Sequence, residues 1–268
     1  MNYSGRTALI TGASSGIGEA FARALAERGM GLALAARNTE KLGSLAQSLR
    51  KLHGVAVEVI PSDLCQPGAA ARLHAEVRRR GLEIDWLVNN AGVTAVGRFD
   101  RVPLPQQSAL LQLNVVALTE LAHLFAQELV ERKGAMINVA SLGAFQPDPY
   151  YAVYGASKAY VLNFSEALWA EYRGVGLRVL AVCPGLTQTN IFEASGNRDT
   201  VKLVERAAKA GLVMTPEEVV AQSLRALEKG RSHVVTGLAN RLTSQLPRIA
   251  PRAWMARAGA ALMKRSKS

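Results

Sequence analysis

The sequence predicts an α/β fold: a doubly wound, mainly seven-stranded parallel sheet with helices on both faces, in three α/β/α layers. Short apolar runs alternate with longer segments whose apolar residues recur nearer every 3.6 than every 2 positions. The short runs are almost continuously apolar, which is typical of strands buried on both faces of a parallel sheet. No linker-like stretch and no internal repeat interrupts this alternation, so we expect a single domain over residues 1–268.

The elements follow one another in a regular order along the chain. The strands are expected at 7–11, 32–36, 55–60, 86–90, 135–140, 177–183 and 233–236. The helices are expected at 16–29, 39–53, 67–80, 106–132, 153–172 and 216–229. Two regions stand outside the alternation. We expect residues from about 186 to 214 to form a lid over a substrate, and residues from about 238 to 268 to form a basic C-terminal extension.

Composition excludes several classes of protein. Hydrophobic residues make up 49% of the chain and charged residues 20%, which is typical of a globular protein. The first residues lack the pattern of a secretory signal, and no apolar stretch approaches the ~20 residues that span a bilayer. Cys65 and Cys183 are far apart, so we expect two free thiols and a cytoplasmic location. The four histidines are scattered, and no metal site is expected.

The net charge of +11 is concentrated at the C-terminus. Seven basic residues and no acidic one lie between Arg241 and Ser268, so this segment supplies +7 of the total. The rest of the chain is only mildly basic, and this argues against a surface that binds nucleic acid.

A glycine cluster follows the first expected strand. Gly12, Gly16 and Gly18 remove side chains where the chain must turn, and they let a pyrophosphate approach the backbone. A helix that begins near Gly16 would present free N–H groups and its positive dipole end to that anion. A plain tight turn is the alternative, but the place between a strand and a helix favours nucleotide binding.

The end of the second strand indicates which dinucleotide the chain binds. No acidic residue is present in the sequence Ala35-Ala36-Arg37-Asn38 to hold the ribose 2′-hydroxyl of NAD, whereas Arg37 could contact a 2′-phosphate. We therefore expect NADP(H) to be preferred over NAD(H), unless Arg37 is a solvated surface arginine. Asp63, just past the third strand, either accepts a hydrogen bond from the adenine amino group or caps the next helix.

Three motifs together resemble the classical short-chain dehydrogenase/reductase family, over roughly residues 5–190. They are Thr11-Gly12-Ala13-Ser14-Ser15-Gly16-Ile17-Gly18, Asn89-Asn90-Ala91-Gly92 and Tyr154-Gly155-Ala156-Ser157-Lys158. The resemblance implies a Rossmann-type fold and a segment from Pro184 to Thr189 that holds the nicotinamide carboxamide, with Thr187 where the family usually has a hydrophobic residue. The expected cofactor-binding residues are Gly12, Ser14, Ser15, Gly16, Ile17, Gly18, Arg37, Asp63, Leu64, Asn90, Ala91, Gly92, Tyr154, Lys158, Pro184, Gly185, Thr187 and Thr189.

Four of the six tyrosines surround Lys158 in the stretch YYAVYGASKAY. Tyr154 and Lys158 are four residues apart, which places them about 6 Å apart on one helix face. Tyr151 is roughly 10 Å from the lysine along the axis, Tyr160 points elsewhere, and Tyr150 precedes the helix. We expect the ammonium group to lower the pKa of Tyr154 from about 10 towards neutral pH, so that the phenol exchanges a proton with a carbonyl or alcohol oxygen. The alternative is a packed aromatic ring beside a solvated lysine.

Two further residues complete the expected catalytic set. Ser141 directly follows a strand and could hydrogen-bond a substrate oxygen, or it could cap a turn. Asn114 lies in an otherwise apolar stretch. The resemblance implies that it holds a water that links Lys158 to bulk solvent, whereas a satisfied core asparagine is the alternative. Asn114, Ser141, Tyr154 and Lys158 are thus the predicted catalytic residues.

The sequence therefore predicts an NADP(H)-dependent oxidoreductase that reduces a ketone or aldehyde, or oxidises the matching alcohol. The resemblance, extended to the general character of the tail, suggests an apolar acyl- or steroid-like substrate. Competing functions are a non-catalytic NADP sensor or scaffold, and a sugar-nucleotide epimerase or dehydratase, for which the chain after Thr189 is short.

Two kinds of partner are predicted. The resemblance implies a homodimer or homotetramer that associates through helices 106–132 and 153–172. The basic tail could lie on a membrane surface or an anionic acyl carrier, or pack beside the substrate cleft.

Overall fold

The structure is a computed structural model that describes residues 2–189, 207–208 and 213–265. Most of the expected lid, residues 190–206 and 209–212, lies outside the described residues, as do the last three residues of the tail.

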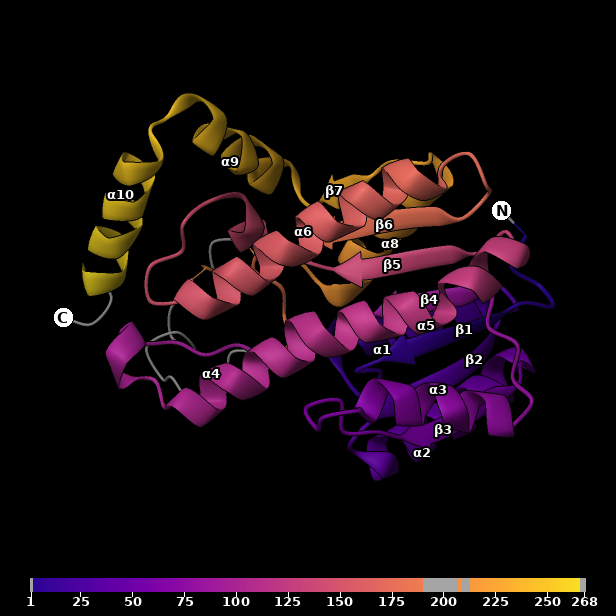
Figure 1. The fold of residues 1–268 in the computed structure, drawn as a ribbon. Coiled ribbons are helices and arrows are strands. Elements are labelled where there is room, and N and C mark those ends of the chain that lie inside the picture. The colour runs from indigo at the N-terminus through magenta and orange to yellow at the C-terminus, as the bar shows by residue number, and fades with distance from the viewer. Residues whose placement is uncertain (1, 190–206, 209–212, 266–268) are drawn as a thin grey trace.

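Seven parallel strands form one sheet in the order β3-β2-β1-β4-β5-β6-β7 (Figure 1), which confirms the predicted fold class. The strand order reverses between β1 and β4, and the carboxyl ends of strands beside such a switch point are where ligands bind in open α/β sheets. The strands are β1 Thr7–Thr11, β2 Gly31–Ala36, β3 Val57–Pro61, β4 Trp86–Asn89, β5 Ala135–Val139, β6 Arg178–Cys183 and β7 His233–Val235.

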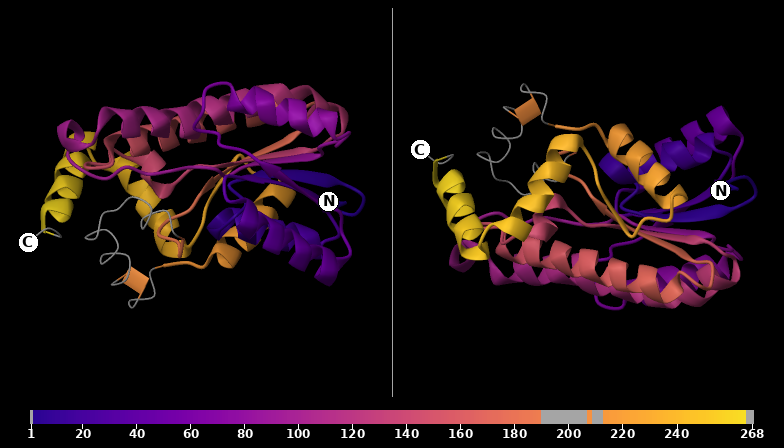
Figure 2. Two further views of the ribbon diagram at one scale, coloured as in Figure 1. Left: turned by 90° about the horizontal axis from the view of Figure 1, so that it is seen from below. Right: turned by 90° about the horizontal axis from the view of Figure 1, so that it is seen from above.

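Helices cover both faces of the sheet because successive strand residues point to opposite sides (Figure 2). Ile10 and Val88 pack with α1 (Gly16–Glu27), α2 (Thr39–His53) and α8 (Pro216–Glu228) in one buried cluster. Leu9 and Leu87 pack with α3 (Ala69–Arg79) and α5 (Leu118–Glu131) in another. The helix α6 (Ala152–Tyr172) runs beside α5 on that second face.

The single helix expected over 106–132 is in fact three consecutive pieces. They are α4 (Leu104–Leu111), a π-helical segment η2 (Gln112–Ala117) and α5. The π-helical turn lies around Asn114, and such turns are frequent at functional sites.

The run Leu104–Glu131 is also long and apolar enough to cross a membrane by length and composition, contrary to the sequence expectation. Its most apolar window is 44% buried within the protein.

The basic extension folds as two helices, α9 (Leu238–Ile249) and α10 (Arg252–Arg265). They leave the sheet after β7 and lie on the side towards which the strands point (Figure 1). A Cβ on Gly259 of α10 would lie 3.2 Å from Cδ of Pro149, so this helix packs against the segment that precedes α6. The helix α10 is thereby brought to the same end of the molecule as the carboxyl ends of the strands.

Candidate active site

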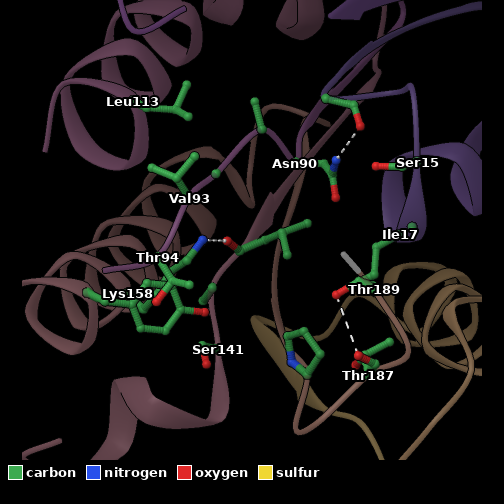
Figure 3. Close-up of a pocket in the computed structure, with 18 of the residues that line it drawn as sticks. Ser15, Ile17, Asn90, Val93, Thr94, Leu113, Ser141, Lys158, Thr187 and Thr189 are labelled. Carbon is green, nitrogen blue, oxygen red and sulfur yellow. Dashed lines mark hydrogen bonds between the residues drawn. The ribbon is translucent and has the colours of Figure 1, made fainter. Parts of the chain in front are cut away.

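A cavity of about 750 Å³ opens at the carboxyl ends of β1, β2, β4, β5 and β6. Its volume lies within the usual range for a small-molecule or cofactor site. Ser15 and Ile17 lie on one side of it, and Ser141 and Lys158 on the other (Figure 3). Of the predicted cofactor-binding residues, all but Gly18 line this cavity. In the described part of the chain, no group of three or more metal-ligating side chains is found.

The glycine cluster forms a cradle at the start of α1. Gly12 and Gly16 have positive φ angles of 65° and 58°. A Cβ on Gly12 would lie 2.9 Å from Asn90 Nδ2, and a Cβ on Gly18 would collide with the same amide and with Gly12 O. Ser15, the N-cap residue, makes no side-chain cap, so the first N–H groups of α1 remain available to an anion. These residues fit the pyrophosphate of a dinucleotide.

Asn90 ties the end of β4 to this cradle. Its Nδ2 donates to the carbonyl oxygens of Thr11 and Gly12 at 2.9 and 3.1 Å, and the backbone N–H groups of Asn90 and Ala91 both donate to Thr11 Oγ1 at 3.1 Å. The Asn-Asn-Ala-Gly motif therefore holds the two strands at the switch point in a fixed relation.

Arg37 lies exposed at the end of β2 and lines the cavity beside Asp63. Asn38 caps α2, with its Oδ1 accepting from Lys41 N at 2.9 Å, so Arg37 is the charged side chain that β2 presents at its end. No acidic side chain is present at this position of the second strand, and a 2′-phosphate would meet no repulsion from it.

Asp63 does not cap the next helix, and that alternative is wrong, because the N-cap of α3 is Gly68. The Asp63 carboxylate instead accepts hydrogen bonds from Cys65 N at 3.2 Å and from Gln66 Nε2 at 3.1 Å. The pKa of the Asp63 carboxyl is lowered, mainly by the hydrogen bond from Gln66 and to a smaller extent by Cys65 and by the charge of Arg37. Asp63 therefore stays ionised at the edge of the cavity, and its role towards adenine stays a prediction.

The phenol of Tyr154 lies near the hydroxyl group of Ser141, just past the end of β5, and both side chains line the cavity. Tyr154 keeps some exposure to the cavity as a residue, but protein surrounds its hydroxyl group. Burial raises the pKa of Tyr154 to about 12, while the nearby Ser141 hydroxyl lowers it and the charge of Asp148 raises it. The expected lowering by Lys158 is therefore wrong for the chain alone, because desolvation of the phenolate outweighs any pull from the ammonium.

Lys158 is buried one turn further along α6. Its Nζ lies 5.9 Å from the centre of the Tyr154 ring and donates to Val139 O at 2.7 Å. Burial lowers the pKa of Lys158 to about 8. The lysine is thus held behind the tyrosine by the last residue of β5, and its charge is sensitive to pH in a range near neutrality.

Asn114 lies behind the cavity wall, next to Lys158. A Cβ on Gly92 would be 3.3 Å from Asn114 Oδ1 and 3.4 Å from Lys158 Nζ, so both groups meet at this glycine. The amide exchanges two 3.0 Å hydrogen bonds with the backbone of Val93 and donates to Ser157 Oγ at 3.1 Å. These bonds are what a satisfied core asparagine makes, and the water-holding role stays a prediction.

The segment after β6 lies over the cradle. Thr187 forms an isolated parallel bridge with Met214, and Thr189 packs close enough to Gly16 that a Cβ there would lie 2.9 Å from its Cγ2. Asn240 of α9 packs directly against Gly185. The expected nicotinamide segment is therefore fixed from both sides, including by the C-terminal extension.

Several cavity residues were not found by the sequence analysis. Met263 comes from α10, and Gln146 and Asp148 come from the loop before α6. The only sequence signal for the loop was the Pro-Asp-Pro stretch ahead of Tyr150, and none existed for Met263. Apolar and small polar residues also join the wall near the catalytic side, namely Val93, Thr94, Leu113, Val139, Ala140, Leu142, Gly143 and Leu186.

Comparison with known proteins gives consistent matches. Residues 6–200 match the family model described as short chain dehydrogenase. The chain is 32% identical to a 7beta-hydroxysteroid dehydrogenase of Collinsella aerofaciens, over 88% of each chain. It is 34% identical to a very-long-chain 3-oxoacyl-CoA reductase of Anas platyrhynchos, over 76% of this chain and 68% of that one. Among solved structures, a short-chain dehydrogenase from Sphingobium yanoikuyae in complex with NADPH superposes with a TM-score of 0.77 at 34% identity, covering 98% of this chain and 96% of that one.

Proposed function

The chain belongs to the short-chain dehydrogenase/reductase family, and from this premise we propose that it is an NADP(H)-dependent oxidoreductase that reduces a ketone or aldehyde. The observation that carries the proposal is that Tyr154 and Ser141 line one side of a cavity whose other side is the glycine cradle. This arrangement supports proton transfer and dinucleotide binding at the two ends of one site.

Tyr154 serves as the proton donor in the proposed reaction. Since burial raises its pKa to about 12, the phenol carries its proton at neutral pH and is ready to protonate a carbonyl oxygen. Ser141 Oγ lies beside it and stabilises the charge that develops on that oxygen. NADPH, when bound, supplies the hydride. Lys158 in its ammonium form stabilises the phenolate that remains after proton transfer.

The preference for NADP(H) rests on Arg37. A guanidinium group pairs with a phosphate in a charge-assisted, bidentate way that it cannot use with a ribose hydroxyl. Solved structures of similar fold include complexes with NADPH and with NAD. Because the fold accommodates both coenzymes, the proposed preference for NADP(H) depends on Arg37 of this chain.

An apolar acyl- or steroid-like carbonyl is the proposed substrate class. The cavity wall includes the apolar residues Val93, Leu113, Leu142 and Met263. The names of similar proteins, a hydroxysteroid dehydrogenase and a 3-oxoacyl-CoA reductase, agree with this class. A sugar-nucleotide substrate is less well supported, because the described residues after β7 form two helices that pack near the cleft.

The direct test is NADPH oxidation, followed by absorbance, against a panel of steroid ketones, 3-oxoacyl thioesters and small aldehydes. We expect turnover with at least one apolar ketone and little with polar sugar ketones. Tight NADPH binding without turnover across the whole panel would instead favour the non-catalytic sensor or scaffold.

The C-terminal extension has two proposed roles. Met263 lines the cavity and Gly259 packs against Pro149, which supports a wall beside the substrate cleft. On α9, the leucines 238, 242 and 246 recur every four residues and are exposed, and Trp254 of α10 is 68% exposed. Apolar side chains among arginines without acidic neighbours suit an anionic lipid surface.

We expect the protein to cosediment with phosphatidylserine vesicles at low salt, and Leu242→Asp to weaken that binding about tenfold or more. Leu52→Asp, at another exposed leucine far from α9, serves as the control. Cosedimentation that is absent, or equal in both variants, would discard the lipid role.

We further propose that the protein is a homo-oligomer in a reducing cytoplasmic environment. Leu111, Val116 and Tyr160 expose apolar surface on the outer side of the α4–α5 run and α6, which supports association there. The two cysteines are free, as expected where thiols stay reduced. Analytical ultracentrifugation measures the assembly directly.

A further inference from the structure

A carboxyl side chain from the loop before α6 is inserted next to the Tyr154–Ser141 pair. Asp148 lies between Gly143 and Gly155: a Cβ on Gly143 would be 2.9 Å from Asp148 Oδ2, and a Cβ on Gly155 would be 2.9 Å from Asp148 Cβ. Neither glycine has a positive φ angle, so glycine is not required there by the backbone conformation. The absence of a side chain at each position leaves room for Asp148. The two glycines together make the slot that admits the aspartate.

The loop fixes the direction of this side chain. Prolines on both sides of Asp148 restrict the backbone, since proline fixes its own φ and limits the residue before it. Tyr150 has a φ of 69°, and its carbonyl oxygen accepts from Gly97 N at 2.9 Å. A non-glycine residue in this region costs free energy and persists only where its surroundings impose it, often at binding sites.

Two polar side chains of this loop, Asp148 and Gln146, line the cavity. Asp148 makes no ion pair with any described residue, and burial raises the pKa of its carboxyl to about 6. Gln146 lines the same cavity, and its Oε1 is buried without a hydrogen-bond partner. Buried acceptors are normally paired, so Gln146 Oε1 calls for a donor from a ligand, and the Asp148 carboxyl beside it in the cavity wall can accept from the same ligand.

The carboxyl also lies close to the reacting position. The point that a Cβ on Gly143 would occupy is 2.9 Å from Asp148 Oδ2 and 3.7 Å from Ser141 Oγ. The charge of Asp148 acts on the phenol of Tyr154 as well. A donor bound to Asp148 would therefore sit within a few bonds of a carbonyl held by Ser141 and Tyr154.

We propose that Asp148 and Gln146 form a subsite that accepts a hydrogen bond from a hydroxyl group of the substrate, a few bonds from its reacting carbonyl. The proposal rests on the proposed carbonyl reduction and narrows its substrates to hydroxyketones with an apolar remainder. Such a subsite discriminates strongly, because a ligand without the hydroxyl leaves the buried Gln146 Oε1 unpaired.

The test compares 2-octanone with 1-hydroxy-2-octanone and 4-hydroxy-2-octanone as substrates of the wild type, with NADPH. We expect kcat/KM to be about tenfold or more higher for one hydroxyketone than for 2-octanone. In Asp148→Ala this ratio should fall to near 1, and in Gln146→Leu it should fall partway. Asp100→Ala removes an exposed carboxylate outside the cavity and should keep the wild-type ratio.

A ratio is insensitive to general loss of folded enzyme, so it separates a subsite from a structural role. Wild-type turnover of all three ketones at equal kcat/KM, or an unchanged ratio in both loop variants, would overturn the subsite and leave carbonyl reduction standing. Turnover of none of these or of the wider panel would overturn the proposed function, and the subsite with it.

Discussion

Tyr154→Phe is expected to lower kcat for carbonyl reduction by about 10²- to 10⁴-fold, the usual contribution of a general acid. The variant loses the proton that burial holds on the phenol at neutral pH, and it leaves Ser141 as the remaining donor at the carbonyl oxygen. NADPH affinity should change by less than about threefold, because the ring and the glycine cradle remain. Single-turnover assays and fluorescence titration of NADPH measure the two effects separately.

Tyr160→Phe is the matched control on the same helix. The Tyr160 hydroxyl contacts Thr119 Oγ1 at 2.9 Å, and the residue does not line the cavity. Its kcat should stay near the wild-type value. A Tyr154→Phe enzyme that kept more than about a tenth of the wild-type rate would show that another group donates the proton.

Arg37→Ala is expected to weaken NADPH binding about 10- to 100-fold while changing NADH binding by less than about threefold. The arginine ends β2 beside the cavity without an acidic neighbour on that strand, so its guanidinium is available to a 2′-phosphate and has no partner on NADH. Equilibrium titration with each coenzyme gives the ratio of the two dissociation constants.

Arg98→Ala removes an exposed arginine that pairs with Asp100 outside the cavity, and it should change neither constant. It also tests for a general effect of lowering the positive charge of the protein. Equal losses of NADPH and NADH affinity in Arg37→Ala would remove the argument for the 2′-phosphate.

The sheet could be predicted because apolar runs and glycine punctuation are local signals. The run 7–11 coincides with β1, whereas β2 begins one residue earlier than expected and β3 ends one later. Gly31 at the start of β2 pairs with Thr7 of β1, and Pro61 at the end of β3 pairs with Ala36 of β2. Each added residue is therefore part of its strand because it pairs with a residue of the neighbouring strand. Pairing partners set the ends of strands, and the sequence of one strand does not contain them.

The motif residues of the site could be predicted for a similar reason. Gly12, Asn90 and Ser141 lie at or just past strand ends, and parallel strands bring those ends to one edge of the sheet. The π-helical turn at Asn114 could not be predicted, because it depends on how α4 and α5 pack rather than on the apolar period.

The direction of the Tyr154 pKa shift was the main property that the sequence predicted wrongly. The spacing of Tyr154 and Lys158 is consistent with the predicted neighbourhood, but the sign of the pKa shift depends on burial, which spacing does not report. Asp148 and Met263 were missed because a loop and a distant helix bring them to the cavity. Such long-range contacts have no local pattern.

The proposed proton transfer depends most on where the Tyr154 hydroxyl points when coenzyme and substrate are bound. A crystal structure with NADP⁺ and the alcohol product tests this directly. We predict that the alcohol oxygen lies within about 3.2 Å of both Tyr154 Oη and Ser141 Oγ, with the nicotinamide ring beside it. A phenolic oxygen turned away from the nicotinamide, with another residue contacting the alcohol, would contradict the account.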